Sequence, residues 1–282
     1  MAKINLIQAK DNSFYCDSIF SIGVYIKDKM AVLIDSGISK DVAKDIDKSL
    51  MQANVKVVAI INTHCHGDHC GGNAFFQQKY PQIRIFSTET ERPFIEDQKI
   101  VIWGEIFEII TLPGHTRGMI AVKTPDNVLY CGDAIFGEDT FRKYPILYYT
   151  FIDDTLNSFK KLRSLIRSVA VSIIYHGGMI TDLALLIDDH ERRILETKNM
   201  IFSMLSECSL SLEEITARIM QTYKIPDDLI SYALTRVPMQ AYVAELEREN
   251  LVEVRVTSGI TRVHVIDKSP THLSHHNSAV IM

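Results

Sequence analysis

The stretch Thr63-His64-Cys65-His66-Gly67-Asp68-His69 places four potential metal ligands within six residues. It directly follows residues 55–61, a run of small and β-branched side chains that predicts a buried strand. On an extended segment His64 and His66 project to the same side, and Gly67 allows the chain to turn into a helix carrying Asp68 and His69. Imidazole and carboxylate groups gathered at a strand end indicate a metal site. The alternative interpretation is a surface loop that happens to be rich in histidine.

Length and composition restrict the remaining possibilities. The chain has 282 residues, of which 46% are apolar, and a formal net charge of −5. This length accommodates one large domain, or one of about 200 residues with a small one. There is no run of about 18 uncharged apolar residues for a membrane span, and no signal-peptide layout at the start. With five cysteines that show no paired spacing, we expect a cytoplasmic location. The acidic balance disfavours binding to a long nucleic acid.

Other candidate residues also follow strand-like runs. Asp35 follows residues 31–34, His115 follows 107–111, Asp133 follows 128–130 and His176 follows 169–175. In layered α/β folds functional groups collect at strand ends, so we expect these side chains to converge on residues 64–69. Taken singly, each has an ordinary explanation as a loop histidine, a helix cap or a turn aspartate.

The chain changes character after about residue 186. Residues 187–204 predict a connector helix, and residues 205–268 predict a small domain. In that domain a capping box, Ser211 to Glu214, opens a first helix; a second covers 228–235 and a third starts near Pro238. A hairpin follows around Ser258-Gly259. Three short helices and a hairpin are the outline of a winged helix.

Two more segments have simple expectations. Residues 88–96 predict a helix with Pro93 in its first turn. Residues 269–282 show no period and predict a mobile tail, whose three histidines are expected to be solvated rather than ligands.

The order His-x-His-x-Asp-His, then His, Asp and His, resembles that of the metallo-β-lactamase superfamily. The resemblance covers about residues 1–186 and implies an α/β fold, the αββα metallo-β-lactamase sandwich, with a dinuclear metal centre. By this resemblance His64, His66 and His115 hold the first ion, Asp68, His69 and His176 hold the second, and Asp133 bridges both. The two divalent ions are expected to be Zn²⁺, although iron or manganese also suits these ligands.

Four further residues near the ligands receive supporting roles. Asp35 resembles the superfamily's aspartate that orients a metal ligand. Cys65, Cys70 and Cys131 lie close to ligand positions, and thiolates do bind zinc. Cys65 and Cys70 are interpreted as packing residues, because free cysteine often packs as a small apolar side chain. Cys131 is interpreted as a core residue, because the ligand set is already full.

The resemblance implies a hydrolase in which a hydroxide held by two metal ions attacks a thioester or related acyl bond of a small molecule. Asp68 would orient that nucleophile and take its proton. The bridging Asp133 argues against an antibiotic-hydrolysing β-lactamase. More loosely, the C-terminal half is similar to the branch called β-lactamase-like protein two, which carries a C-terminal winged helix. That branch includes thioesterases and an RNA-cleaving enzyme.

Three alternatives remain open: a single-strand endoribonuclease, a mononuclear-iron persulfide dioxygenase, and a binding or regulatory protein with an incidental metal site. Acidic residues in the small domain, such as Glu245, Glu247 and Glu249, disfavour RNA binding. The seven-residue ligand set disfavours the other two. The loop 136–154 contains Tyr144, Tyr148 and Tyr149, which predict an apolar acyl pocket or a lid packed on the core.

Overall fold

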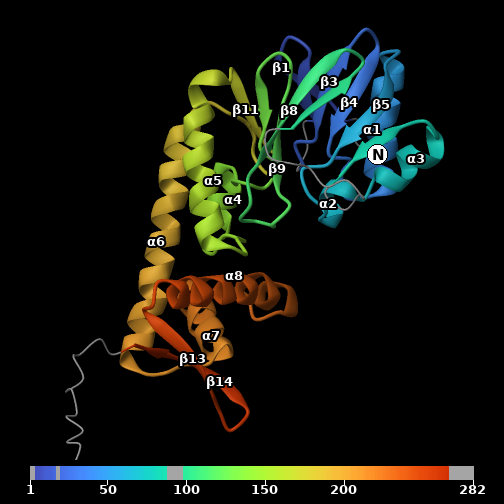
Figure 1. Ribbon diagram of the computed structural model, residues 1–282. Coiled ribbons are helices and arrows are strands. Elements are labelled where there is room, and N and C mark those ends of the chain that lie inside the picture. The colour runs from blue at the N-terminus through green and yellow to red at the C-terminus, as the bar shows by residue number, and fades with distance from the viewer. Residues whose placement is uncertain (1–3, 17–19, 88–97, 267–282) are drawn as a thin grey trace, which may run out of the picture.

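The protein is described by a computed structural model that covers residues 4–16, 20–87 and 98–266. The helix expected over 88–96 and the tail 269–282 therefore lie outside the described residues. Two six-stranded mixed sheets form the centre of the larger part of the molecule, and helices cover their outer faces (Figure 1). Among the described residues, no helix combines the length and the apolar character that a membrane crossing requires.

The first sheet contains the N-terminal strands in sequence order. β4 and β5 pair in parallel, as do β5 and β6, while the earlier neighbours are antiparallel. Its parallel connections pass through helices α1 (Lys40–Gln52), α2 (Gly67–Cys70) and α3 (Asn73–Lys79). The strands are β1 (Leu6–Lys10), β2 (Ser13–Cys16), β3 (Gly23–Lys27), β4 (Met30–Ile34), β5 (Lys56–Ile61) and β6 (Arg84–Phe86).

The second sheet has the order β12-β11-β10-β9-β8-β7, and its β10 and β11 pair in parallel. Their connection contains α4 (Glu138–Lys143), α5 (Ile152–Leu165) and the short 3₁₀ helix η1 (Ile166–Ser168). The sequence analysis missed α4 and β12, which are both too short to show a clear period. The strands are β7 (Lys99–Ile102), β8 (Glu105–Thr111), β9 (Ile120–Lys123), β10 (Val128–Tyr130), β11 (Val171–Ile174) and β12 (Gly178–Ile180).

Three buried apolar clusters account for the layers. One joins the facing sides of the two sheets, with Val32 and Ile61 from the first sheet and Phe107 and Val122 from the second. Another packs α1 and α3 on the first sheet, and the third packs α5 and the C-terminal helices on the second. Strands buried on both faces are continuous apolar runs, which is why residues 57–61 were recognisable from sequence. The predicted α/β sandwich is confirmed, and both of its sheets are mixed.

The C-terminal part begins with one long helix, α6 (Leu183–Glu207), which extends out of the sandwich (Figure 1). Beside its far end lie α7 (Leu212–Tyr223), α8 (Leu229–Arg248) and the hairpin of β13 (Val252–Thr257) and β14 (Ile260–Val265). The predicted capping box at Ser211 and Glu214 is confirmed, with both hydrogen bonds formed. α6 starts at Leu183, four residues before the predicted connector helix 187–204.

The predicted break between two short helices at residues 235–238 is wrong, because α8 runs through Pro238 without interruption. Proline removes one backbone hydrogen bond from a helix interior and usually kinks or ends it. Here Thr235, Pro238, Met239 and Tyr242 are all buried. Their burial on one face holds the helix together across the missing bond.

Buried His190 connects α6 to the loop that follows β10. Its Nδ1 donates to the carbonyl of Leu186 at 2.8 Å, and its Nε2 accepts from the backbone N–H of Phe136 at 3.3 Å. Burial lowers the pKa of His190 to about 4, with Arg193 adding to that effect and Asp189 opposing it. The neutral imidazole therefore ties the long helix to the loop that carries Asp133.

We expect the hydrogen bond between Phe136 and His190 to weaken in acid. The unfolded chain binds a proton at His190 with a pKa near 6.5, whereas the folded chain resists protonation until about pH 4. Stability from this group is therefore complete above the unfolded pKa and decreases by about 2 kcal/mol between pH 7 and pH 5. Urea unfolding of the wild type and of His190→Gln at pH 7 and at pH 5 measures the free energy of unfolding of each protein. The stability gap between the two proteins should narrow at pH 5; a gap of unchanged size would contradict the prediction.

Candidate metal centre

Strand direction brings the candidate residues to one edge of the sandwich. Parallel neighbours β4 and β5 end shortly before Asp35 and His64, and parallel neighbours β10 and β11 end shortly before Asp133 and His176. β8, which precedes His115, runs in the same direction as β10 because both are antiparallel to β9. The expected convergence of these residues is confirmed by their mutual distances.

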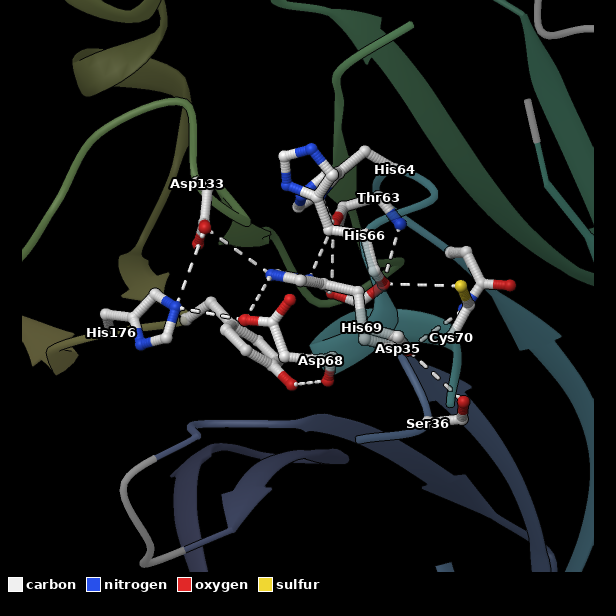
Figure 2. A network of polar contacts seen from close by, with 12 residues as sticks. Asp35, Ser36, Thr63, His64, His66, Asp68, His69, Cys70, Asp133 and His176 are labelled. Carbon is white, nitrogen blue, oxygen red and sulfur yellow. Dashed lines mark hydrogen bonds and ion pairs between the residues drawn. The ribbon is translucent and has the colours of Figure 1, made fainter. Parts of the chain in front are cut away.

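The residues form two groups. Within each group, the potential ligand atoms all lie within 4.8 Å of one another. The first group contains His64, His66 and His115, and here Nε2 of His115 lies 2.9 Å from Nδ1 of His66. The second group contains Asp68, His69, Asp133 and His176 (Figure 2). Each group brings together residues from different elements, which no local pattern could achieve.

Asp133 lies between the two groups. Its Oδ2 is 3.5 Å from Nε2 of His69 and 3.6 Å from Nε2 of His176, both in the second group. The same oxygen is 3.6 Å from Nε2 of His115, in the first group. One carboxylate oxygen thus contacts histidines of both groups, which is the arrangement expected of a bridging ligand.

The close approach of Asp133 depends on Gly132. Gly132 has a φ of +54°, and a Cβ at this position would lie 2.7 Å from Oγ1 of Thr63 and 2.4 Å from Cε of Met119. A side chain here would therefore push the end of β10 away from the end of β5. Glycine allows the two sheets to meet where the site is built.

Buried partners orient the histidines. Nδ1 of His69 lies 2.8 Å from Oδ2 of Asp35, and Nδ1 of His115 lies 2.8 Å from the carbonyl oxygen of Tyr148. Contacts of this kind fix the ring and leave Nε2 facing the centre. Asp35 also accepts from the backbone N–H of Thr63 at 2.8 Å and from its hydroxyl at 2.9 Å. The predicted orienting role of Asp35 agrees with this geometry.

Tyr175 is a site residue that the sequence analysis missed. Its ring stacks on His69 with centroids 3.7 Å apart, and its hydroxyl donates to the backbone carbonyl of Asp68. It therefore supports two residues of the second group at once. Its position directly before His176 was a possible signal, but stacking on a distant residue leaves no mark in a local pattern.

The charge states of the centre are strongly coupled. Burial lowers the pKa of His69, but Asp35 and Asp133 outweigh that effect and raise it to about 10. Burial also opposes protonation of His176, but Asp133 and Asp68 raise its pKa to about 9. By contrast, burial dominates at His64, whose pKa falls far below its usual range.

Burial raises the pKa of the Asp133 carboxyl, but His69 and His176 more than compensate and hold it well below its usual range. The centre therefore keeps a buried carboxylate, Asp133, whose charge requires positive charge nearby. His69 and His176 face this carboxylate, and their raised pKa values favour the charged imidazolium form there.

The residues present fit metal ions. Three buried atoms at the centre, Nε2 of His64, Nε2 of His69 and Oδ1 of Asp133, make no hydrogen bond within the described part of the chain. Buried polar atoms without partners are costly and usually have a functional reason. Ligands at about 2.0–2.1 Å from a tetrahedral zinc ion lie about 3.3 Å apart, close to the 3.5 Å between His69 and Asp133. The two groups are consistent with a dinuclear metal site.

The three nearby cysteines belong to neither group within the described residues. Cys131 is fully buried, and burial raises the pKa of its thiol to about 12. The Cys70 thiol donates to the carbonyl of His66 at 3.2 Å, and Cys65 lies 3.6 Å from the hydroxyl of Ser87. These contacts agree with the packing roles that were predicted.

A cavity of about 640 Å³ opens onto both groups. Its floor contains His66, His115, Asp68, Asp133 and His176, and its walls are mostly apolar. Of the three tyrosines in the loop 136–154, Tyr144 and Tyr148 line the cavity, as the pocket alternative predicts, whereas Tyr149 is buried in the core, as the lid alternative predicts. The other wall residues are Phe20, Phe136, Asp139, Thr140, Lys143, Ile146, Leu147 and Leu234.

Comparison with known proteins defines the class. Residues 21–172 match the model of the metallo-beta-lactamase superfamily, and this match covers more than half of the chain. The chain belongs to that superfamily.

Curated relatives include hydroxyacylglutathione hydrolases. The one from Trichormus variabilis is 33% identical over 137 residues, which cover 44% of this chain and 52% of the relative. The one from Prochlorococcus marinus is 29% identical over 206 residues, which cover 69% of this chain and 78% of the relative. The chain thus spans about half the length of the first of these relatives.

Among solved structures, the chain is similar to a beta-lactamase domain protein from Burkholderia ambifaria. The TM-score is 0.77 at 14% sequence identity, and 94% of each chain is covered. This likeness supports the fold, including the C-terminal helices.

Replacing Asp35 tests the orienting contact. In Asp35→Asn one side-chain oxygen becomes an NH₂ group, so it can no longer accept from both Thr63 and His69. We expect the affinity for Zn²⁺ to fall about 10- to 100-fold, measured by competition with a chromogenic chelator. Asp47→Asn is the matched control, because Asp47 is also buried but pairs with Lys79 and Tyr80 far from the centre. Equal Zn²⁺ affinity in both variants would rule out the orienting role.

Proposed function

We propose that the chain is a metal-dependent hydrolase that cleaves a thioester or a related acyl bond of a small molecule. The observation that carries this proposal is the position of Asp133 between two His/Asp groups at the floor of an apolar-walled cavity. The similarity to hydroxyacylglutathione hydrolases supports a thioester substrate.

We assign the ligands as the residue groups suggest. His64, His66 and His115 would hold one ion, Asp68, His69 and His176 the other, and Asp133 both. When bound, two divalent ions lower the pKa of a water molecule towards about 7 and polarise the substrate carbonyl. We keep Zn²⁺ as the proposed metal, because imidazole and carboxylate ligands suit it.

Asp68 is the proposed catalytic residue. Its carboxylate lines the cavity and lies 3.4 Å from Nε2 of His176. Burial raises the pKa of Asp68, but His176 and His69 outweigh burial and lower it, so the group is a carboxylate at neutral pH. A carboxylate that faces the substrate can orient a water molecule and accept its proton.

We also propose the domain division 1–186, 187–204 and 205–268, with a winged-helix-like last domain. Its support is the order of elements after α6, namely α7, α8 and the β13–β14 hairpin. The cytoplasmic location stays a prediction from the cysteine spacing.

Activity and metal content test the proposal together. The purified protein should contain about two metal ions per chain and hydrolyse thioesters of small thiols, such as hydroxyacylglutathione, in preference to β-lactams. Asp133→Ala should reduce turnover more than replacement of any single histidine, because Asp133 would serve both ions. Elemental analysis and a thiol-release assay measure these effects. At most one ion per chain after reconstitution, or normal turnover in Asp133→Ala, would contradict the dinuclear assignment.

The C-terminal domain should not bind nucleic acid. Four of its arginines already pair with neighbouring acids, so few cations remain for phosphates. Full-length protein titrated with single-stranded RNA and duplex DNA at low salt should show no micromolar binding, since low salt exaggerates weak electrostatic contacts. Micromolar binding with a steep salt dependence would favour the endoribonuclease alternative. The pairs are Arg236–Glu213, Arg248–Glu245, Arg255–Glu253 and Arg262–Glu214.

A further inference from the structure

Helix α8 has a second apolar face besides the one buried in its own domain. Ile230, Leu234, Val237, Ala241 and Ala244 recur at intervals of three or four residues, so they form one stripe along the helix. We call these five residues the α8 stripe. The residues buried in the small domain, such as Met239, Tyr242 and Leu246, lie on the opposite side. A helix that is apolar on two faces requires a partner for each of them.

The hydrolase domain faces the C-terminal half of the α8 stripe. Val237, Ala241 and Ala244 line a groove together with Phe151 and Ile152, at the start of α5. At the end of the helix, Arg248 pairs with Asp153 of α5 at 3.1 Å. These contacts fix the direction in which the rest of the stripe points, because a helix is rigid over this length. Figure 1 shows α8 crossing beneath α4 and α5.

The N-terminal half of the α8 stripe reaches the metal-site cavity. Leu234 lines that cavity although it comes from the C-terminal domain, and its side chain is 43% exposed. Ile230 lies one turn earlier on the same face and is 73% exposed. Leu229 and Ile230 are the two most exposed large apolar residues in the described part of the chain.

This exposed turn is a formed part of the helix. Asp228 caps it by accepting from the backbone N–H groups of Ile230 and Ser231, both at 2.9 Å. Capped in this way, the first turns of α8 hold Leu234 at the cavity wall and Ile230 one turn beyond it on the same face of the helix. Exposed aliphatic side chains held beside a cavity are a typical feature of apolar ligand sites.

Apolar wall residues extend from the metal groups to Leu234, although the lining also contains Asp139, Thr140 and Lys143 of α4. Phe136 and Tyr148 lie next to His115, with ring centroids 5.8 Å and 5.5 Å from its ring. Ile146 and Leu147 continue the lining, and Leu234 follows on the α8 side. An alkyl chain that lies along these apolar residues would be removed from water, which favours its binding.

We infer that the cavity walls and the N-terminal half of the α8 stripe form a subsite for an unbranched acyl chain, so that the preferred substrates are medium-chain acyl thioesters. This inference rests on the proposed thioester hydrolysis. The metal groups would act on the thioester carbonyl while the alkyl chain extends along Phe136, Ile146 and Leu234 to Ile230. The C-terminal domain then determines chain-length preference.

A chain-length series tests the subsite. The wild type should hydrolyse an octanoyl thioester with a kcat/KM about tenfold or more above that for the acetyl thioester of the same thiol, since each buried methylene adds favourable transfer free energy. In the double variant Ile230→Ser with Leu234→Ser, the octanoyl-to-acetyl ratio of kcat/KM should fall about tenfold. The matched control, Leu185→Ser with Leu195→Ser, removes two exposed leucines of α6 that do not line the cavity and should keep the wild-type ratio.

A binding measurement separates this inference from the proposed function. Decanoate and acetate carry the same carboxylate and are not hydrolysed, so their difference in affinity, measured by titration calorimetry, reports only on the chain. The wild type and the α6 control should bind decanoate at least tenfold more tightly than acetate, and the α8 double variant should lose most of that difference. This result would stand even if no thioester were cleaved.

Three results would overturn the subsite. They are equal kcat/KM for the two thioesters in the wild type, an unchanged octanoyl-to-acetyl ratio in the α8 double variant, and equal binding of decanoate and acetate. Gel filtration adds a further distinction. If the double variant changed the oligomeric state while the ratio stayed constant, the stripe would be an interface between copies of the chain, and the proposal would be wrong.

Discussion

The buried carboxylate of Asp35 is the contact on which the centre depends. It accepts from the backbone and the hydroxyl of Thr63 and faces the ring of His69, so it ties the end of β4 to the end of β5 and to α2. Asp35 has a φ of +68°, a left-handed conformation that costs free energy for a residue with a side chain. The surrounding hydrogen bonds stabilise that conformation, and together they hold His69 in place.

Charge balance explains why so many acids and histidines can share this edge of the sandwich. Asp35 and Asp133 are both buried, and a buried carboxylate is stable only beside positive charge or several donors. His69 faces both carboxylates, which is why its pKa is raised despite its burial. Metal ions at the two residue groups would supply positive charge at the same place, so the site is arranged for cations before any ion binds.

The C-terminal part shares a buried apolar cluster with the sandwich. Its core residues, including Ile215, Met239 and Leu246, belong to the same buried cluster as Phe159 and Ile174 of the sandwich. α6 contributes to this cluster along its length, with Ile187 near its start and Leu205 near its end. This continuity allows α8 to hold a fixed position near the metal groups.

Much of the fold and most of the site were readable from local patterns. Buried strands such as residues 57–61 are continuous apolar runs, and the capping box at Ser211 is a purely local motif. The motif from His64 to His69 and the strand-end positions of His115, Asp133 and His176 identified the residues of both groups. Errors occurred where distant contacts override local preference, as in the buried Pro238 that does not interrupt α8.

The sequence by itself determined which residues make up the centre, because ligand types, their order and the turns after strands are properties of neighbouring residues. Only the tertiary structure decided how they combine, with Asp133 between the two groups, Tyr175 stacked on His69 and Leu234 at the cavity wall. Those contacts join residues far apart in the chain. Their geometry follows from how the two sheets and the C-terminal helices pack, which a period of two or of 3.6 residues does not encode.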